Sequence, residues 1–140
     1  MDIRVTENNL AQALALHREN PVVDAHLDLA GEILLRHQAG EEDVIRRHYL
    51  SDFKKAGIRL VVSSVFVEND NLKDGWQNAL KQIAALKKEV SGLDELTFIE
   101  SSRDLEQLLK GEKIGILLYM EGLDCIGEDI DRINELFKLG

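Results

Sequence analysis

Strand-like apolar segments alternate with amphipathic helical segments along almost the whole chain. The segment 58–67 is β-branched and shows scarcely any polar alternation, which is typical of a parallel strand covered on both sides. Strands that alternate with helices favour right-handed crossovers and a parallel sheet. We therefore predict an α/β fold with four parallel strands in sequence order and helices on one side of the sheet. The expected strands are 22–29, 58–67, 96–100 and 114–120, and the expected helices are 6–20, two pieces within 31–55, 72–91, 101–111 and 128–139.

Length, charge and cysteine content narrow the class of protein. The chain has 140 residues, 44% of them hydrophobic, which is enough for one domain with a core. Its net charge of -9 disfavours nucleic acid and anionic membrane surfaces as partners. The single cysteine, Cys125, excludes an internal disulfide and fits a reducing compartment. The sequence shows no signal-peptide core or membrane-spanning run, so the expected location is the cytoplasm.

The first expected strand carries three polar side chains within an otherwise apolar run. Side chains alternate between the two faces of an extended strand, so Asp24, His26 and Asp28 are expected on one face. An imidazole nitrogen and carboxylate oxygens that converge on one face suit a divalent metal, zinc above all. The alternative is a strand end whose histidine and aspartates hydrogen-bond to neighbouring loops.

A further carboxylate, Glu121, follows the last expected strand directly. In parallel α/β folds, functional sites assemble at the carboxyl ends of the strands, so the common location of His26, Asp28 and Glu121 favours the metal interpretation. The three side chains would hold one zinc, or Glu121 would bridge two zinc ions if further histidines were available. Zinc lowers the pKa of bound water to about 7 and polarises a carbonyl, so either arrangement supports hydrolysis.

Other chemistries lack a matching motif. The sequence has no glycine-rich dinucleotide or phosphate loop and no Gly-x-Ser-x-Gly turn, and Cys125 has no obvious base partner. The remaining histidines, His17, His37 and His48, lie in charged helical contexts and are interpreted as solvated residues, not ligands.

Several segments, in the right order, resemble the renal (membrane) dipeptidase family of zinc peptidases. Asp-Ala-His-Leu-Asp at 24–28 is similar to the opening Asp-Gly-His-Asn-Asp strand of that family. The segment 57–66 resembles the family's second strand. Tyr-Met-Glu-Gly at 119–122 and the later acidic helix ending at 137–140 resemble its Glu-Gly segment and the Leu-Gly before the next strand.

The resemblance implies a (β/α)₈ barrel with a binuclear zinc centre that hydrolyses dipeptides. Position by position, it implies that His26 and Asp28 bind one zinc and that Glu121 bridges both and is catalytic. Ala25 and Leu27 depart from the usual Gly and Asn, and Leu123 replaces a common second Gly, which leaves the ligands intact but affects substrate preference. The family's two later histidines and its substrate-binding residues have no counterpart here.

Length then suggests that the chain is the amino-terminal half of such a metal-dependent hydrolase barrel. A (β/α)₈ barrel takes about 250 residues or more, and this sequence ends after the fourth unit. We expect the chain alone to be inactive, with its first and fourth strands as open edges and an apolar inner face that includes Leu117 and Tyr119. Self-association, or pairing with the missing carboxyl-terminal half, would cover that face. The rival interpretation is a non-catalytic half-barrel that serves as a binding or assembly module.

Overall fold

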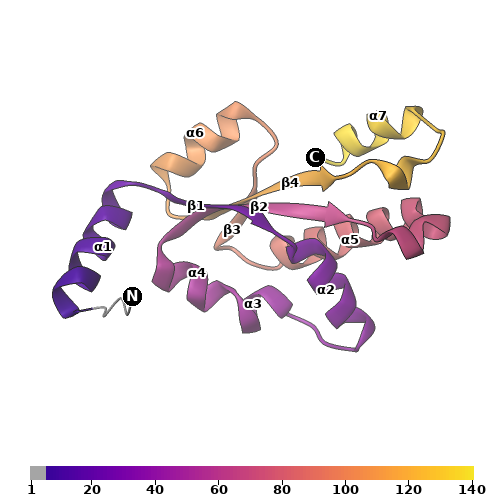
Figure 1. Cartoon of the computed structure of the whole chain (residues 1–140). Coiled ribbons are helices and arrows are strands. Elements are labelled where there is room, and N and C mark those ends of the chain that lie inside the picture. Colours follow the sequence, from indigo (N-terminus) through magenta and orange to yellow (C-terminus); the bar gives the residue numbers. More distant parts are fainter. Residues whose placement is uncertain (1–5) are drawn as a thin grey trace, which may run out of the picture.

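The computed structural model describes residues 6–140, and its centre is a four-stranded parallel sheet (Figure 1). The strands are β1 (Val22–Leu27), β2 (Ile58–Phe66), β3 (Leu96–Phe98) and β4 (Ile114–Glu121). All three pairings between neighbouring strands are parallel. The predicted α/β class, with parallel strands alternating with helices, is therefore confirmed.

The helices lie close to their predicted positions. They are α1 (Glu7–Glu19), α2 (Leu29–Gln38), α3 (Val44–His48), α4 (Leu50–Ala56), α5 (Gly75–Ser91), α6 (Ser102–Lys110) and α7 (Asp131–Lys138), with short 3₁₀ helices η1 (Asn69–Asp74) and η2 (Asp124–Ile126). Thr6 and Ser101 cap α1 and α6 by accepting backbone N–H bonds. The segment 31–55 contains parts of three helices, not two pieces. None of the helices in the described part of the chain combines the length and apolarity required to cross a bilayer.

The predicted sequence order of the strands is wrong, because the sheet order is β1-β2-β4-β3. β4 pairs with β2 from Gly115 to Glu121, whereas β3 has only three residues and pairs with β4 at Ile114–Ile116. The long apolar strand therefore occupies the interior position and the short strand the edge. The first strand, β1, is an open edge as predicted, but the other open edge is β3 and not the predicted fourth strand. Beyond Ile116, the β3-side edge of β4 has no strand partner among residues 6–140.

The prediction that helices cover one side of the sheet is also wrong, for α6. Helices α2 to α5 lie on one side of the sheet and α6 lies on the other (Figure 1). The chain moves outward from β2 to β3 and then back to β4, so a right-handed crossover must place its helix on the opposite face. Gly115 of β4 permits the close packing of α6 against this face, because a Cβ at this position would lie 2.6 Å from Leu108 Cδ2 and 2.9 Å from Ile99 Cγ1.

The hydrophobic core lies between the sheet and the α2–α5 side. Each large side chain removed from water there contributes about 1.5–3 kcal/mol of transfer free energy. Fully buried members are Leu29, Ile33, Ile45, Val61, Leu86 and Ile116. The opposite face is less well covered, and Val23 and Phe66 remain exposed there. The sheet therefore has one packed face and one partly open face.

A buried carboxylate, Glu89 of α5, joins three helices on the packed side. Glu89 Oε1 lies 2.7 Å from His37 Nε2, and Glu89 Oε2 accepts a 3.1 Å bond from the Ile45 backbone N–H. The two side chains are only 5% and 18% exposed, so the interpretation of His37 as solvated is wrong. Burial raises the pKa of Glu89, but the hydrogen bonds from His37 and from the Ile45 and Val44 backbone outweigh it and lower the pKa overall.

Replacing Glu89 with alanine is expected to reduce the free energy of unfolding by about 1–3 kcal/mol, because it leaves a buried N–H without its acceptor. Chemical denaturation measures this change. Glu42→Ala is the matched control, since Glu42 forms an exposed ion pair with Lys88. An equal loss in both variants would contradict a special role for Glu89.

Because the pKa of Glu89 is lowered, we expect part of the free energy of unfolding to be lost in acid. The pKa of Glu89 is lower in the folded than in the unfolded chain, so its contribution is complete above the unfolded-state pKa. It is lost as the pH falls through the folded-state pKa. The unfolding free energy of Glu89→Ala should therefore fall less steeply in acid than that of the wild-type chain.

Candidate metal centre

An irregularity in β1 decides which of its polar side chains face the open side of the sheet. Asp24 pairs with Val61, and the next pair is Leu27 with Ser63. Between these two pairs β1 therefore advances by three residues and β2 by two, so β1 contains a bulge. The extra residue interrupts strict alternation. Asp24 is paired with Val61, which is buried on the helix-covered face, so the side chain of Asp24 lies on that same face. Its carboxylate accepts a 3.2 Å bond from the His26 backbone N–H. The prediction that Asp24 shares a face with His26 and Asp28 is therefore wrong.

Three of the predicted side chains do converge, at the carboxyl ends of β1 and β4. His26 Nε2 lies 3.5 Å from Asp28 Oδ1 and 3.5 Å from Glu121 Oε2. One potential ligand atom from each residue lies within 4.8 Å of the other two. His26 is the penultimate residue of β1, Asp28 precedes α2, and Glu121 is the last residue of β4 before a turn at Gly122 with φ 74°. The parallel sheet thus brings together residues far apart in the sequence.

The donor set fits a divalent metal such as zinc. It provides one imidazole nitrogen and two carboxylate oxygens, which are donor types that zinc accepts. The carboxylates of Asp28 and Glu121 lie close enough to repel each other, and a cation bound between them would relieve that repulsion. The side chains of His26, Asp28 and Glu121 are 52%, 72% and 43% exposed, so a metal and a small molecule can reach them. Among the described side chains, those of residues 6–68 and 72–140, this is the one group of three or more that could hold a metal.

Two hydroxyl groups contact this cluster and had no assigned role from sequence. Tyr119 Oη lies 2.5 Å from His26 Nδ1, and Ser64 Oγ donates to Asp28 Oδ1. Burial and then the negative charges of Glu121 and Asp28 raise the pKa of Tyr119. Tyr119 lies two residues before Glu121 and was predicted on the inner face with Leu117, but its contact with His26 was not predicted. The contact of Ser64 depends on strand pairing, which sequence alone does not provide.

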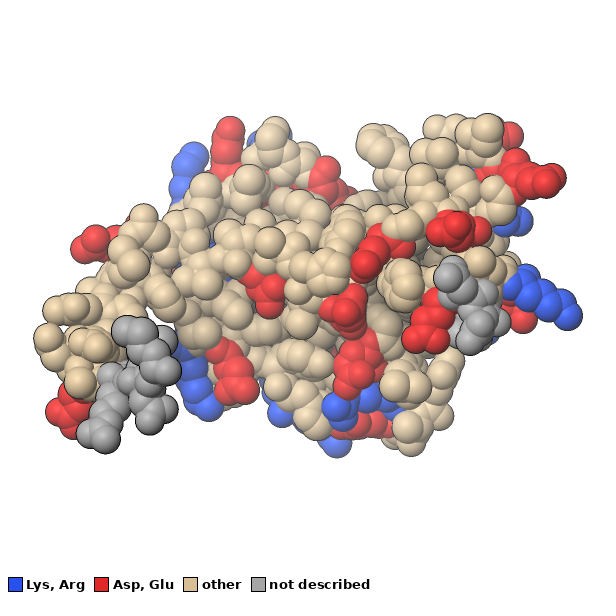
Figure 2. Space-filling model, viewed as in Figure 1, with Lys and Arg blue, Asp and Glu red and all other residues tan. Residues whose placement is uncertain are grey.

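Acidic side chains gather around the strand ends on the face shown in Figure 2. A hollow of about 810 Å³ adjoins the cluster there. Its wall includes the buried amide of Gln82, whose Oε1 has no hydrogen-bond partner. Glu32 and Glu68 add further acceptor groups, while Leu34 and Phe66 provide apolar surface. The site therefore combines a candidate metal centre with a space beside it that is rich in acceptors.

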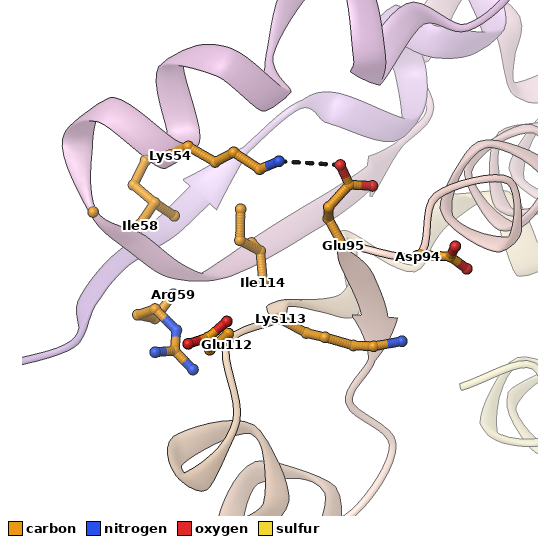
Figure 3. Close-up of a pocket in the computed structure, with 9 residues that line it drawn as sticks. Lys54, Ile58, Arg59, Asp94, Glu95, Glu112, Lys113 and Ile114 are labelled. Carbon is orange, nitrogen blue, oxygen red and sulfur yellow. Dashed lines mark hydrogen bonds and ion pairs between the residues drawn. The ribbon is translucent and has the colours of Figure 1, made fainter.

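A second hollow, of about 500 Å³, lies at the amino-terminal ends of the strands and lacks such a donor set (Figure 3). Lys54 Nζ pairs with Glu95 Oε1 at 3.0 Å. Arg59 donates to the Leu108 and Gly111 carbonyls at 2.6 and 2.8 Å. Two of its cations are therefore already engaged by the chain's own acceptors. We therefore place the candidate functional site at the other end of the sheet, where the carboxyl ends of the strands lie.

The other histidines do not join the metal-competent group. His17 Nδ1 lies 2.9 Å from the Ala56 carbonyl, and His48 contacts Glu41, which also pairs with Arg36. His37 is engaged by Glu89. Each of these three rings has a structural partner away from the candidate site.

Comparison with known proteins relates the chain to one group of peptidases. Residues 10–140 match the family model described as membrane dipeptidase, peptidase family M19. Two similar crystal structures are dipeptidase AC, a family M19 metallopeptidase (TM-score 0.74, 19% identity), and a metallopeptidase from Rhodobacter sphaeroides bound to a phosphinate mimic of the dipeptide L-Ala-D-Ala (0.70, 18%). Each alignment covers 86% of this chain, but only 40% and 43% of those structures. No match was found among curated proteins.

Titration calorimetry with zinc tests the geometry directly. Asp28→Asn is expected to weaken zinc binding by about tenfold or more, since loss of a direct ligand should cost at least as much as loss of an outer partner. Asp24→Asn is the matched control and should leave the affinity nearly unchanged, because Asp24 lies on the other face. Equal effects of the two substitutions would contradict this assignment.

Proposed function

The chain belongs to the membrane dipeptidase family, peptidase family M19, and on that premise we propose that it is the amino-terminal half of a metal-dependent dipeptidase. The observation that carries the proposal is the convergence of His26, Asp28 and Glu121 at the carboxyl edge of the sheet. The chain spans less than half the length of the two similar structures. Activity is therefore proposed for the complete protein, and this chain alone is expected to be inactive.

We assign the metal site to zinc, with two ions in the complete protein. His26 and Asp28 would hold one ion, and Glu121 would be the carboxylate shared with the second ion and the catalytic residue. Nitrogen and oxygen ligands suit zinc, and a carboxylate has two oxygens with which to bridge. Bound metal supplies Lewis-acid activation of water and of the peptide carbonyl. The chain's own residues place that chemistry beside the hollow lined by Leu34, Phe66 and Gln82.

The proposed substrate is a dipeptide. The Rhodobacter sphaeroides metallopeptidase was crystallised with a dipeptide mimic, which supports this class for a relative with a similar fold. In this chain the carboxylates beside the cluster, including that of Glu68, suit a substrate with a positively charged amino group. The apolar wall formed by Leu34 and Phe66 suits a small uncharged side chain.

Loss and recovery of activity in the complete protein test this proposal. Dipeptide hydrolysis should disappear on removal of metal and return when zinc is added. Glu121→Gln should reduce turnover by roughly 100-fold or more, because the substituted amide is a poorer metal ligand and cannot bridge as a carboxylate does. Glu106→Gln changes an exposed glutamate of α6 in the same way and should have little effect. Undiminished turnover in Glu121→Gln would refute the assignment.

The open face of the sheet favours a second candidate function, a non-catalytic half-barrel that acts as a binding or assembly module. Val23, Phe66 and Leu123 are exposed on or next to this face, and uncovered apolar surface costs about 25 cal/mol per Å². Both candidates predict self-association of the isolated chain, which sedimentation at micromolar concentration measures. Phe66→Glu should weaken association, whereas Leu16→Glu on α1 should not. A stable monomer would contradict the association claim, and zinc-dependent hydrolysis by the complete protein would exclude the non-catalytic function.

A further inference from the structure

Two hydroxyl groups lie side by side on the open face, directly behind the candidate metal ligands. Ser64 of β2 and Tyr119 of β4 are paired residues in the parallel register, and the next pair on this face is Phe66 with Glu121. The two hydroxyls thus occupy the layer of the sheet that precedes the ligand layer. Ser64 is buried and Tyr119 is partly buried, so the sheet restricts the positions of both.

Tyr119 contacts the ring nitrogen of His26 that does not face the carboxylates. Its Oη lies 2.5 Å from Nδ1, and the two rings meet edge to face with centroids 5.8 Å apart. With Nδ1 engaged, Nε2 is the nitrogen that lies 3.5 Å from both Asp28 and Glu121. A metal bound through Nε2 requires the ring proton on Nδ1, where the tyrosine oxygen can accept it. Rotation of the ring would break the contact with Tyr119.

Ser64 restrains the second ligand in the same way. Its hydroxyl donates to Asp28 Oδ1, and Ser64 Oγ also lies 3.4 Å from the Leu27 carbonyl oxygen. Asp28 itself is largely exposed at the start of α2, and this hydroxyl is the group of β2 that contacts its carboxylate. The bond holds one carboxylate oxygen toward the position shared with His26 Nε2 and Glu121 Oε2.

The neighbouring serine shows that burial alone does not explain Ser64. Ser63 is also fully buried, but it pairs with Leu27 on the helix-covered side and its Oγ has no hydrogen-bond partner. A buried hydroxyl without a partner costs free energy, and that cost applies to Ser63. Ser64 instead satisfies its hydroxyl through a ligand of the candidate site.

We propose that Tyr119 and Ser64 are positioning residues of the metal site, Tyr119 by fixing the ring of His26 and Ser64 by fixing the carboxylate of Asp28. The inference rests on the proposed metal-dependent function and concerns residues outside the ligand set. Outer partners that orient metal ligands typically contribute about 10–100-fold to metal affinity. Both hydroxyls are expected to act in this range without touching metal or substrate.

The test compares Tyr119→Phe and Ser64→Ala with Ser63→Ala, which removes a buried hydroxyl from the same strand but not from the site. Zinc affinity by calorimetry is expected to fall about 10–100-fold in the first two variants and to stay unchanged in the control. Nitrogen-15 spectra of the His26 ring in the metal-free chain supply an independent readout, at a pH where the ring is neutral. The wild-type ring should show one dominant tautomer, and Tyr119→Phe should shift both ring nitrogens toward the values of a tautomer mixture.

The outcomes separate this inference from the proposed function. Unchanged zinc affinity in Tyr119→Phe together with unchanged ring shifts would overturn the role of Tyr119. Unchanged affinity in Ser64→Ala would overturn that of Ser64. Equal weakening in Ser63→Ala would show a general loss of folding and overturn both roles. If the wild-type chain binds no zinc but the His26 shifts respond to Tyr119→Phe, the positioning contact stands and the proposed metal function falls.

Discussion

The candidate site depends on the parallel pairing of β1, β2 and β4. Parallel pairing places the carboxyl ends of all three strands at one edge of the sheet. It therefore joins His26 to Tyr119, which lies 93 positions later in the chain. A shift of β4 by one residue would turn Glu121 to the helix-covered face and remove its carboxylate from the cluster. The long pairing of β2 with β4 fixes that register, and the tight packing around Gly115 fixes it at the opposite end.

The uneven cover of the two sheet faces links stability to function. Helices α2 to α5 bury the core on one face, and α6 covers only the amino-terminal part of the other. The ligand layer at the far end stays open to water, where Asp28 and Glu121 can remain charged close to each other. Any further structure over this face would lower the local dielectric and strengthen both the repulsion between the carboxylates and their attraction for a metal. The ligands are thus on rigid strands while their surroundings remain accessible.

Local sequence patterns predicted the elements and the three clustered residues because these depend on local periodicity and on the rule that strand ends share an edge. Asp24 failed this reasoning because one extra residue in β1 changes the face, and a bulge of this kind has no signature in the run 22–29. The strand order failed because it depends on which strands pair, a property of residues distant in the chain. The contact of His37 with Glu89 was missed for the same reason, since 52 positions separate them. The surrounding sequence indicated that His37 lies in a helix, but it could not indicate that Glu89 of another helix is its partner.

The central claim is that a divalent metal binds between His26, Asp28 and Glu121, and paramagnetic NMR locates such an ion without reference to activity. Cobalt(II) added to the isotope-labelled chain shifts and broadens signals steeply with distance from the metal. We predict that the first signals affected are those of Leu27, Ser64 and Glu121, around the carboxyl ends of β1, β2 and β4. Effects centred instead on Glu41 and His48, or on Asp94 and Glu95 at the opposite edge of the sheet, would contradict the account.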